Sequence, residues 1–323
     1  MRHPRLIPLV AVAHGSRDPR AAATVTGLLS AVTARAPRRG LPGLDVRAAF
    51  LDHCAPSLPQ VLGSVSGSES GGGEAAVVVP LLLTAAYHSK ADIPAQLAAA
   101  AAARPGLDVV SAGTLGPHPL LAAALERRLR EAGVSVDDAD ARAATSVVLA
   151  AAGSSDPSAN ATIAALAARW QRERGWRVVA PAYASAAGPR PAEAVRALRD
   201  ASADSGAGAA RVVVATYLLA PGYFADKVRD AALGAGASAV SGVLGAAPEV
   251  ADIILDRYRA AAADRAAQSI VARAQLTGAH GCDPPVRNGL HGGKPTWNGC
   301  TAHAAPHIIS NAVGFVRSGG GPC

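Results

Sequence analysis

Two segments of this chain repeat one pattern 138 positions apart, and only the first of them contains histidine. The first reads Ala13-His14-Gly15-Ser16-Arg17-Asp18-Pro19, and the second reads Ala151-Ala152-Gly153-Ser154-Ser155-Asp156-Pro157. An apolar run precedes each segment. The repetition indicates that the chain is built from two similar halves.

Two further pairs of segments continue this duplication. They are Leu82–His88 with Leu218–Phe224, and Leu115–Pro119 with Leu244–Pro248. Glycine, proline and tyrosine positions recur between the copies, whereas His14, His88 and His118 are replaced by Ala152, Phe224 and Ala247. A duplicated fold needs only one working site, so the recurring residues are candidates for structural roles and the three histidines for chemistry.

The length of 323 residues fits two domains of ordinary size. We predict an N-terminal domain over 1–137 that carries the site histidines, a degenerate repeat over 145–265 and an irregular tail over 278–323, which we expect to be disordered. Each half is long enough to bury its own core. Aromatic residues make up only 3% of the chain, so we expect cores of Ala, Val and Leu between helices and a sheet.

Short apolar runs without polar alternation are typical of strands that are buried on both faces. They lie at 6–13, 46–51, 75–83, 107–111, 147–151, 177–180, 211–218 and 239–244. Segments with helical character alternate with them at 21–35, 57–65, 91–103, 119–131, 159–174, 191–201, 225–233 and 248–262. Strict alternation predicts an α/β protein with two similar doubly wound parallel-sheet domains and helices on both faces of each sheet.

The net charge of +7 favours an anionic partner. The chain lacks a Lys/Arg block and holds few aromatic residues, so we expect no nucleic-acid partner. Residues 2–13 resemble a signal peptide, but Pro8 interrupts the apolar run and the same element recurs in mid-chain. No run is long enough to span a membrane. Cys54 stands apart from the three cysteines of the tail, so we expect no disulfide framework and a cytoplasmic location.

His14 and His88 are the strongest candidates for a functional site. In an open α/β sheet, ligands bind beyond the carboxyl ends of the strands. His14 follows the first predicted strand and His88 follows the third, so we expect both to face one crevice. Two imidazoles can bind a divalent transition metal ion and accept protons near neutral pH. The alternative, that each is an ordinary interior histidine, is weakened because the second copy lacks both.

Polar residues beside the two histidines form the remaining candidate site. The residues expected to contact a substrate are Ser16, Arg17, Asp52, Lys90 and His118. Asp18 is a plausible helix N-cap and Pro19 suits the first helical turn, whose N-terminus attracts anions. Arg17 and Lys90 are either solvated surface charges or partners for substrate carboxylates. His118 lies in a Gly-Pro-His-Pro segment that is alternatively explained by turn and capping chemistry.

The roles of His53 and of the Cys and His residues in the tail stay open. His53 follows Asp52 at the same predicted rim, and its counterpart region around Tyr183–Ser185 lacks histidine and acid. The tail contains four candidate metal ligands, Cys282, Cys300, His303 and His307. The last three have the spacing C-x2-H-x3-H, which resembles half of a zinc site. The tail has no CxxC pair and no predicted helix or strand to hold these residues in place.

The segments Val12–Pro19 and Val79–His88, with the run YH-x-K-x-D-I-P, resemble the sirohydrochlorin chelatases of the CbiX/SirB type, which are class II chelatases. The resemblance covers about residues 6 to 262. In that family two histidines across the cleft bind the metal and assist proton removal, which maps onto His14 and His88. Long members have two similar α/β halves with the histidines kept in one.

This resemblance implies insertion of Fe²⁺ or Co²⁺ into sirohydrochlorin, a carboxylate-rich tetrapyrrole, for sirohaem or cobalamin biosynthesis. It implies a lyase that takes the divalent metal as substrate and uses no organic cofactor. We expect no membrane partner, and the sequence leaves open whether the protein is a monomer or a homodimer. The sequence does not choose between iron and cobalt. Two other classes remain: a metal-binding carrier that uses His and Cys residues, and an anion-binding α/β module that uses the Gly15–Pro19 turn.

Overall fold

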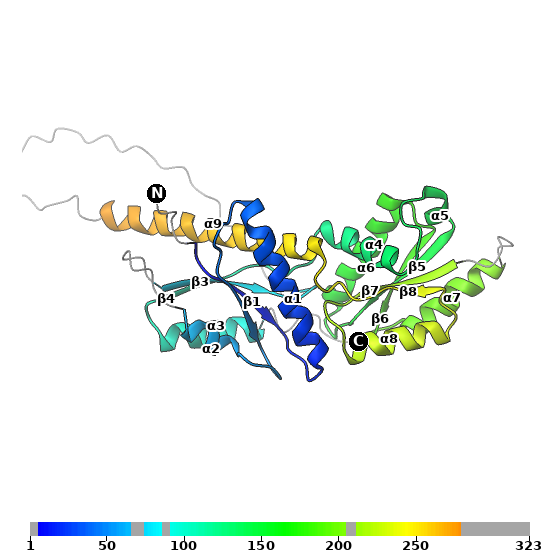
Figure 1. Cartoon of the computed structure of the whole chain (residues 1–323), viewed down its shortest axis with the longest axis horizontal. Helices are drawn as coiled ribbons and strands as arrows, with labels where there is room; N and C mark the ends of the chain where they lie inside the picture. Colours follow the sequence, from blue (N-terminus) through cyan, green and yellow to red (C-terminus); the bar gives the residue numbers. More distant parts are fainter. Residues whose placement is uncertain (1–5, 66–73, 86–90, 205–210, 279–323) are drawn as a thin grey trace, which may run out of the picture. The chain divides into compact units, whose positions relative to one another are not determined.

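The computed structural model of the chain describes residues 6–65, 74–85, 91–204 and 211–278 (Figure 1). It divides into two compact units, Met1–Gln275 and Leu276–Cys323. The predicted tail over 278–323, with its cysteines and histidines, lies outside the described residues except for its first position. Both α/β halves belong to the first unit.

The first half contains a four-stranded parallel sheet in the order β2-β1-β3-β4. Its strands are β1 (Leu9–Ala13), β2 (Val46–Phe50), β3 (Glu74–Pro80) and β4 (Leu107–Ser111). The helices of this half are α1 (Pro19–Arg35), α2 (Leu58–Gly63), α3 (Ile93–Ala103) and α4 (Leu120–Glu131), with a 3₁₀ turn at Ala36–Arg39. This alternation is the predicted one.

The second half repeats the topology with the strand order β6-β5-β7-β8, again all parallel. Its strands are β5 (Thr145–Ala151), β6 (Val178–Tyr183), β7 (Arg211–Tyr217) and β8 (Ala239–Val240). Its helices are α6 (Pro157–Arg174), α7 (Pro191–Asp204), α8 (Tyr223–Gly234) and α9 (Pro248–Gly278). The predicted fold class, two similar doubly wound α/β halves, is confirmed.

Several elements differ from the sequence prediction, among them β8, which spans 2 residues where a strand over 239–244 was expected. A short helix, α5 (Ala139–Ala143), occupies the polar connection between the halves, because the Asp138 carboxylate accepts hydrogen bonds from the Asp140 and Ala141 amides and starts a turn. Helix α9 continues well beyond the predicted end at residue 262. Its later part is rich in Ala, Arg and Gln, which favour a helix without any amphipathic period.

Each sheet packs one face against helices of its own half. In the first half Val10 and Val12 of β1 meet Leu58, Leu62 and Ile93 of α2 and α3. In the second half, Val148 and Ala150 of β5 join a core with residues of α7 and α8. Each of these two cores contains residues of only one half, as expected.

The opposite faces of the sheets share one core. Leu9 and Ala11 of β1 belong to the same buried cluster as Leu149 of β5 and Trp170 of α6. The expectation that each half buries its own core therefore holds for one face of each sheet and fails for the other. The reason is that alternate residues of a strand point to opposite faces, so one strand serves two cores.

Helices α4 and α9 are exchanged between the halves. Helix α4, from the first half of the sequence, packs against β7 of the second sheet, and α9 lies along the first half (Figure 1). The Tyr258 hydroxyl of α9 donates to the Ile7 carbonyl at 2.7 Å, and burial raises the pKa of Tyr258 to about 12. Further along α9, Arg265 donates to Asp108 at the start of β4. The boundaries 1–137 and 145–265 stay a prediction about the sequence repeats, since packing crosses them.

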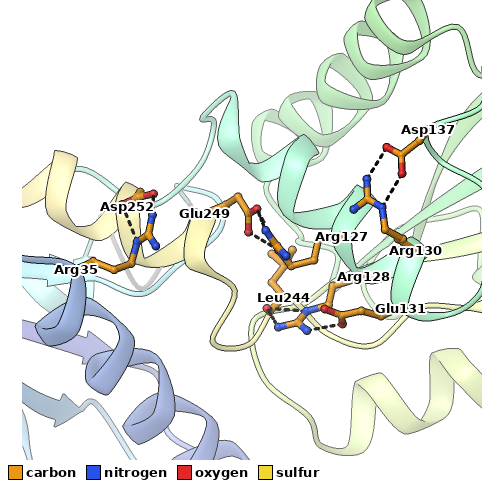
Figure 2. Close-up of polar contacts among 9 residues, drawn as sticks. All are labelled: Arg35, Arg127, Arg128, Arg130, Glu131, Asp137, Leu244, Glu249 and Asp252. Carbon is orange, nitrogen blue, oxygen red and sulfur yellow. Dashed lines mark hydrogen bonds and ion pairs between the residues drawn. The ribbon is translucent and has the colours of Figure 1, made fainter. Parts of the chain in front are cut away.

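Ion pairs hold the start of α9 to α1 and α4 (Figure 2). Arg35 of α1 pairs with Asp252, and Arg127 of α4 pairs with Glu249 at 2.6 Å. The hydrogen bonds to these carboxylates raise the pKa of both guanidinium groups. On the same helix as Arg127, Arg128 donates to the Leu244 carbonyl at 2.8 Å. Helix α1 is thus tied to α9, and helix α4 is tied both to α9 and to the chain segment that leads into it.

The Glu126→Ala variant is expected to lose about 2–3 kcal/mol of the free energy of unfolding. Glu126 of α4 is buried, and its Oε1 accepts from the indole N–H of Trp170 at 3.0 Å and from Arg174 at 2.6 Å. Without the carboxylate, a fully buried indole N–H loses its acceptor. Urea denaturation followed by tryptophan fluorescence measures the loss.

Glu131→Ala is the matched control, because Glu131 lies on the same helix, is half exposed and pairs with Arg128. It is expected to cost no more than about 1 kcal/mol. Equal unfolding midpoints for the two variants would show that α4 is not held to the second half through Glu126.

Candidate functional site

The turn after β1 has the geometry that the sequence predicts. His14 is exposed directly beyond the end of β1, and Gly15 has a φ of +94°. The Asp18 side chain accepts from the Arg20 amide at 2.9 Å and caps α1, which begins at Pro19. The hydrogen bond from Arg20 lowers the pKa of the Asp18 carboxyl. The turn is therefore rigid at its helical end and presents His14 at the carboxyl edge of the sheet.

The loop after β2 lies directly on this turn. The Asp52 amide donates to the His14 carbonyl at 2.9 Å, and a Cβ on Gly15 would overlap the Asp52 carbonyl oxygen. The Cys54 thiol adds a contact to the Ser16 carbonyl at 3.1 Å. The glycine is thus required twice, for its backbone conformation and for the close approach of the second loop.

The second copy preserves this scaffold without the histidine. Gly153 has a φ of +85°, and a Cβ there would overlap the Ser185 carbonyl oxygen. The Ser185 amide donates to the Ala152 carbonyl at 2.9 Å. Ser185 is therefore the structural counterpart of Asp52, and Ala186, with a φ of 57°, is the counterpart of His53, with a φ of 60°.

His53 lies at the predicted rim beside His14, and the stacking of the two rings is the feature that the sequence did not predict. The two rings stack with their centroids 6.5 Å apart and their planes inclined by 14°. The Asp52 carboxylate accepts from the His53 amide at 2.7 Å and lies 3.3 Å from its Nε2. Its position next to Asp52 and the lack of histidine in the counterpart region are the sequence signals that mark it as a candidate. Its structural counterpart, Ala186, lies one residue beyond the expected counterpart region Tyr183–Ser185.

His14 lines three cavities. One, of about 450 Å³, is also lined by Ser16, Arg17 and His53 and by the segment 218–225 that leads into α8. The next, of about 430 Å³, is lined by residues 81–84 and by the turn of the second copy. The smallest, of about 330 Å³, includes Asp52 and residues of the α3 region. His14 thus stands where two mainly apolar cavities and a smaller, more polar one meet, all of ligand size.

The predicted substrate-contacting residues near His14 line different cavities. Ser16 and Arg17 line the largest cavity, and Asp52 lines the smallest. The Ser16 hydroxyl accepts from the Asp18 amide at 3.1 Å, as the Ser154 hydroxyl does from Asp156 in the second copy, so it also shapes the turn. Arg17 is exposed, and no such charge stands at Ser155.

His88 and Lys90 lie outside the described residues. The expected meeting of His14 and His88 therefore stays a prediction. Among the residues that the structure describes, no three His, Cys, Asp or Glu side chains lie close enough to hold a metal ion together.

His118 lines none of these three cavities. Its Nδ1 accepts from the Leu120 amide at 3.2 Å at the start of α4, and its Nε2 lies 3.9 Å from Asp256 of α9. Burial lowers the pKa of His118, and the neighbouring charge of Arg257 lowers it further. These contacts favour the capping interpretation, and a role in substrate binding stays a prediction.

No helix in the described ranges combines the length and the apolar character needed to cross a membrane.

Comparison with known proteins gives a consistent picture. The model of the CbiX family matches residues 8–132 and 146–261. A sirohydrochlorin cobaltochelatase from Priestia megaterium is 26% identical over 220 residues, which cover 68% of this chain. The matched region spans 66% of that protein, just under two thirds of its length. A sirohydrochlorin ferrochelatase from Bacillus subtilis is 28% identical over 195 residues, which cover 59% of this chain and 70% of that protein.

The fold also matches a solved structure. SirB from Bacillus subtilis with Fe³⁺ superposes with a TM-score of 0.66 at 24% identity, covering 81% of this chain and 97% of that one. At this identity the likeness concerns the fold. The duplicated α/β architecture described above is therefore shared with SirB.

Proposed function

Since the chain belongs to the CbiX family, we propose that it is a sirohydrochlorin chelatase, a lyase that inserts Fe²⁺ or Co²⁺ into the tetrapyrrole. The observation that carries the proposal is the position of His14, which lies at the carboxyl edge of the first sheet where three cavities meet. The relatives named for both metals support it.

In this proposal the divalent metal is a substrate held by His14 and His88. Insertion replaces the pyrrole N–H protons by the metal ion, so the protons need acceptors. A neutral imidazole can accept one of them near neutral pH. The exposed ring of His14, with the His53 ring stacked beside it, suits both binding of an ion that arrives from solvent and transfer of a proton to water.

The substrate side of the site uses the residues around this turn. Arg17 and Lys90 would pair with peripheral carboxylates, Ser16 and His118 would supply further polar contacts, and Asp52 is an acceptor for pyrrole N–H groups. Arg17 supports this assignment because it lines the largest cavity while the second copy holds the neutral Ser155. The net charge of +7 attracts the anionic macrocycle.

The finer features of the proposal are expectations from the sequence and from the family resemblance, and the oligomeric state is left open between two alternatives. The enzyme would act in the cytoplasm, as a monomer or homodimer, without an organic cofactor and without nucleic acid or a membrane as partner. The position of Cys54 apart from the other cysteines and the absence of a basic block support the location and the lack of a nucleic-acid partner.

Mixing the purified protein with sirohydrochlorin and one metal ion at a time tests the proposed function. We expect the absorbance spectrum of the tetrapyrrole to change faster than in protein-free solution with Fe²⁺, Co²⁺ or both. A metal-binding carrier would bind the ion without accelerating this change, and an anion-binding module would do neither. Either result would contradict the chelatase assignment.

A further inference from the structure

Exposed aromatic side chains gather at one place in the described structure, the start of α8. Tyr223 is 70% exposed and Phe224 is 42% exposed. The other described aromatic residues, from Phe50 to Tyr258, are at most 6% exposed. Because large apolar side chains are costly to leave in water, adjacent exposed rings indicate a surface that is covered when the protein works.

These rings border the cavities that His14 lines. Tyr223 and Phe224 both line the cavity of about 450 Å³, and Phe224 also lines the one of about 430 Å³. Phe224 stands at the position that corresponds to His88 in the first copy. In the sequence alignment of the two copies, an aromatic ring thus replaces a candidate metal ligand, and this ring lies in the hollow that His14 lines.

The rings are held in a defined arrangement. They pack edge to face with centroids 5.6 Å apart and planes at 63°, and the Lys227 ammonium lies 5.8 Å from the centre of the Tyr223 ring. Behind them, Arg20 of α1 bonds to Asp226 of α8 at 2.6 Å. This ion pair ties the first turn of α8 to the helix that begins at the His14 turn.

Gly222 lies close to the His14 turn. It has a φ of +149°, and a Cβ there would lie 4.0 Å from both the Ser16 hydroxyl and the Asp18 carboxylate. The backbone just before the aromatic pair therefore runs close to the turn that presents His14. The Arg20–Asp226 ion pair and this close approach place the start of α8 beside the His14 turn.

We infer that Tyr223 and Phe224 form a stacking surface for the flat, conjugated ring of the substrate, so that the second half binds the macrocycle while the first half handles the metal. The inference rests on the proposed function and adds binding residues to it. A flat π-system stacks on exposed aromatic rings whatever residues surround them. One such contact changes the binding affinity for the stacked ligand by roughly 5- to 100-fold. Lys227, beside Tyr223, adds a cation near the carboxylate-rich edge of the ring.

The double variant Tyr223→Ala/Phe224→Ala tests this role in the full-length protein. Titration of metal-free sirohydrochlorin, followed by absorbance, is expected to give a Kd at least about 10-fold above that of the wild type. The rate of insertion at saturating tetrapyrrole and the KM for the metal ion are expected to stay near their wild-type values. Leu233→Ala is the matched control, because Leu233 is on the same helix, is 44% exposed and lines none of the three cavities.

A second double variant, Tyr223→Leu/Phe224→Leu, keeps apolar bulk but removes the rings. It too is expected to bind sirohydrochlorin more weakly than the wild type. An unchanged Kd in either double variant, in a wild type that inserts metal, overturns the stacking surface and leaves the chelatase assignment intact. A wild type that neither binds nor metallates the tetrapyrrole overturns the proposed function itself.

Discussion

The His14→Ala variant is expected to insert metal at least about 100-fold more slowly than the wild type, since one positioned acid–base group contributes on the order of 10²–10⁴ to a rate. Among the described side chains, His14 is the one shared by all three cavities at the sheet edge. Its removal would take away both the proposed metal ligand and the proposed proton acceptor. The initial rate of metallation under saturating sirohydrochlorin and metal measures the effect.

The variant is expected to fold, because the second copy already has alanine at the equivalent position. Ala152 precedes Gly153 in a turn with the same hydrogen bonds. Ser155→Ala, in the turn of that copy, is the matched control and should keep the wild-type rate. If His14→Ala has an unchanged thermal midpoint and still metallates at the wild-type rate, His14 has no part in the reaction.

The Gly15→Ala variant is expected to lose about 2–5 kcal/mol of the free energy of unfolding. A left-handed conformation costs a non-glycine residue roughly 1–3 kcal/mol, and the overlap of its Cβ with a backbone oxygen adds a similar amount. Gly15 has a φ of +94°, and the oxygen belongs to Asp52. Relief of this overlap must move the loop that carries Asp52 and His53. Denaturant unfolding measures the stability, and the metallation rate per folded molecule measures the damage to the site.

Two glycines serve as controls for this result. Gly153→Ala repeats both penalties in the second copy and should lose similar stability, but keep activity per folded molecule. Gly133→Ala places alanine at a φ of +78° where no atom lies within 4 Å, so it should cost only about 1–2 kcal/mol. A Gly15→Ala protein as stable as Gly133→Ala would show that the close approach of the two loops is not required.

The regular elements were largely predictable from sequence because each rests on a local cause. The unalternating runs around Leu9–Ala13 and Arg211–Tyr217 are strands, since both of their faces are covered. Asp18 and Asp156 cap the helices that follow. The short helix α5 escaped prediction because five residues carry no period, and the end of α9 escaped it because the amphipathic pattern stops before the helix does.

The candidate site was predictable only in part. His14 and its glycine turn were visible as a motif, and the predicted capping by Asp18 is confirmed. The stacking of His53 on His14 was not visible, because it depends on a left-handed residue in a loop from another strand. The exposure of Tyr223 and Phe224 beside the same cavities was not visible either, because aromatic residues occur in buried cores as well as on surfaces.

The amino-acid sequence by itself determined the duplicated α/β pattern, the turn that presents His14 and the positions of the helices other than α5 and the end of α9, because these depend on neighbours a few residues away. Only the tertiary structure decided which sheet each helix covers. Helices α4 and α9 flank sheets of nearly the same composition, so local patterns cannot choose between them. The choice is made by contacts between residues distant in sequence, Glu126 with Trp170 and Tyr258 with the Ile7 carbonyl, and these exchange the two helices between the halves.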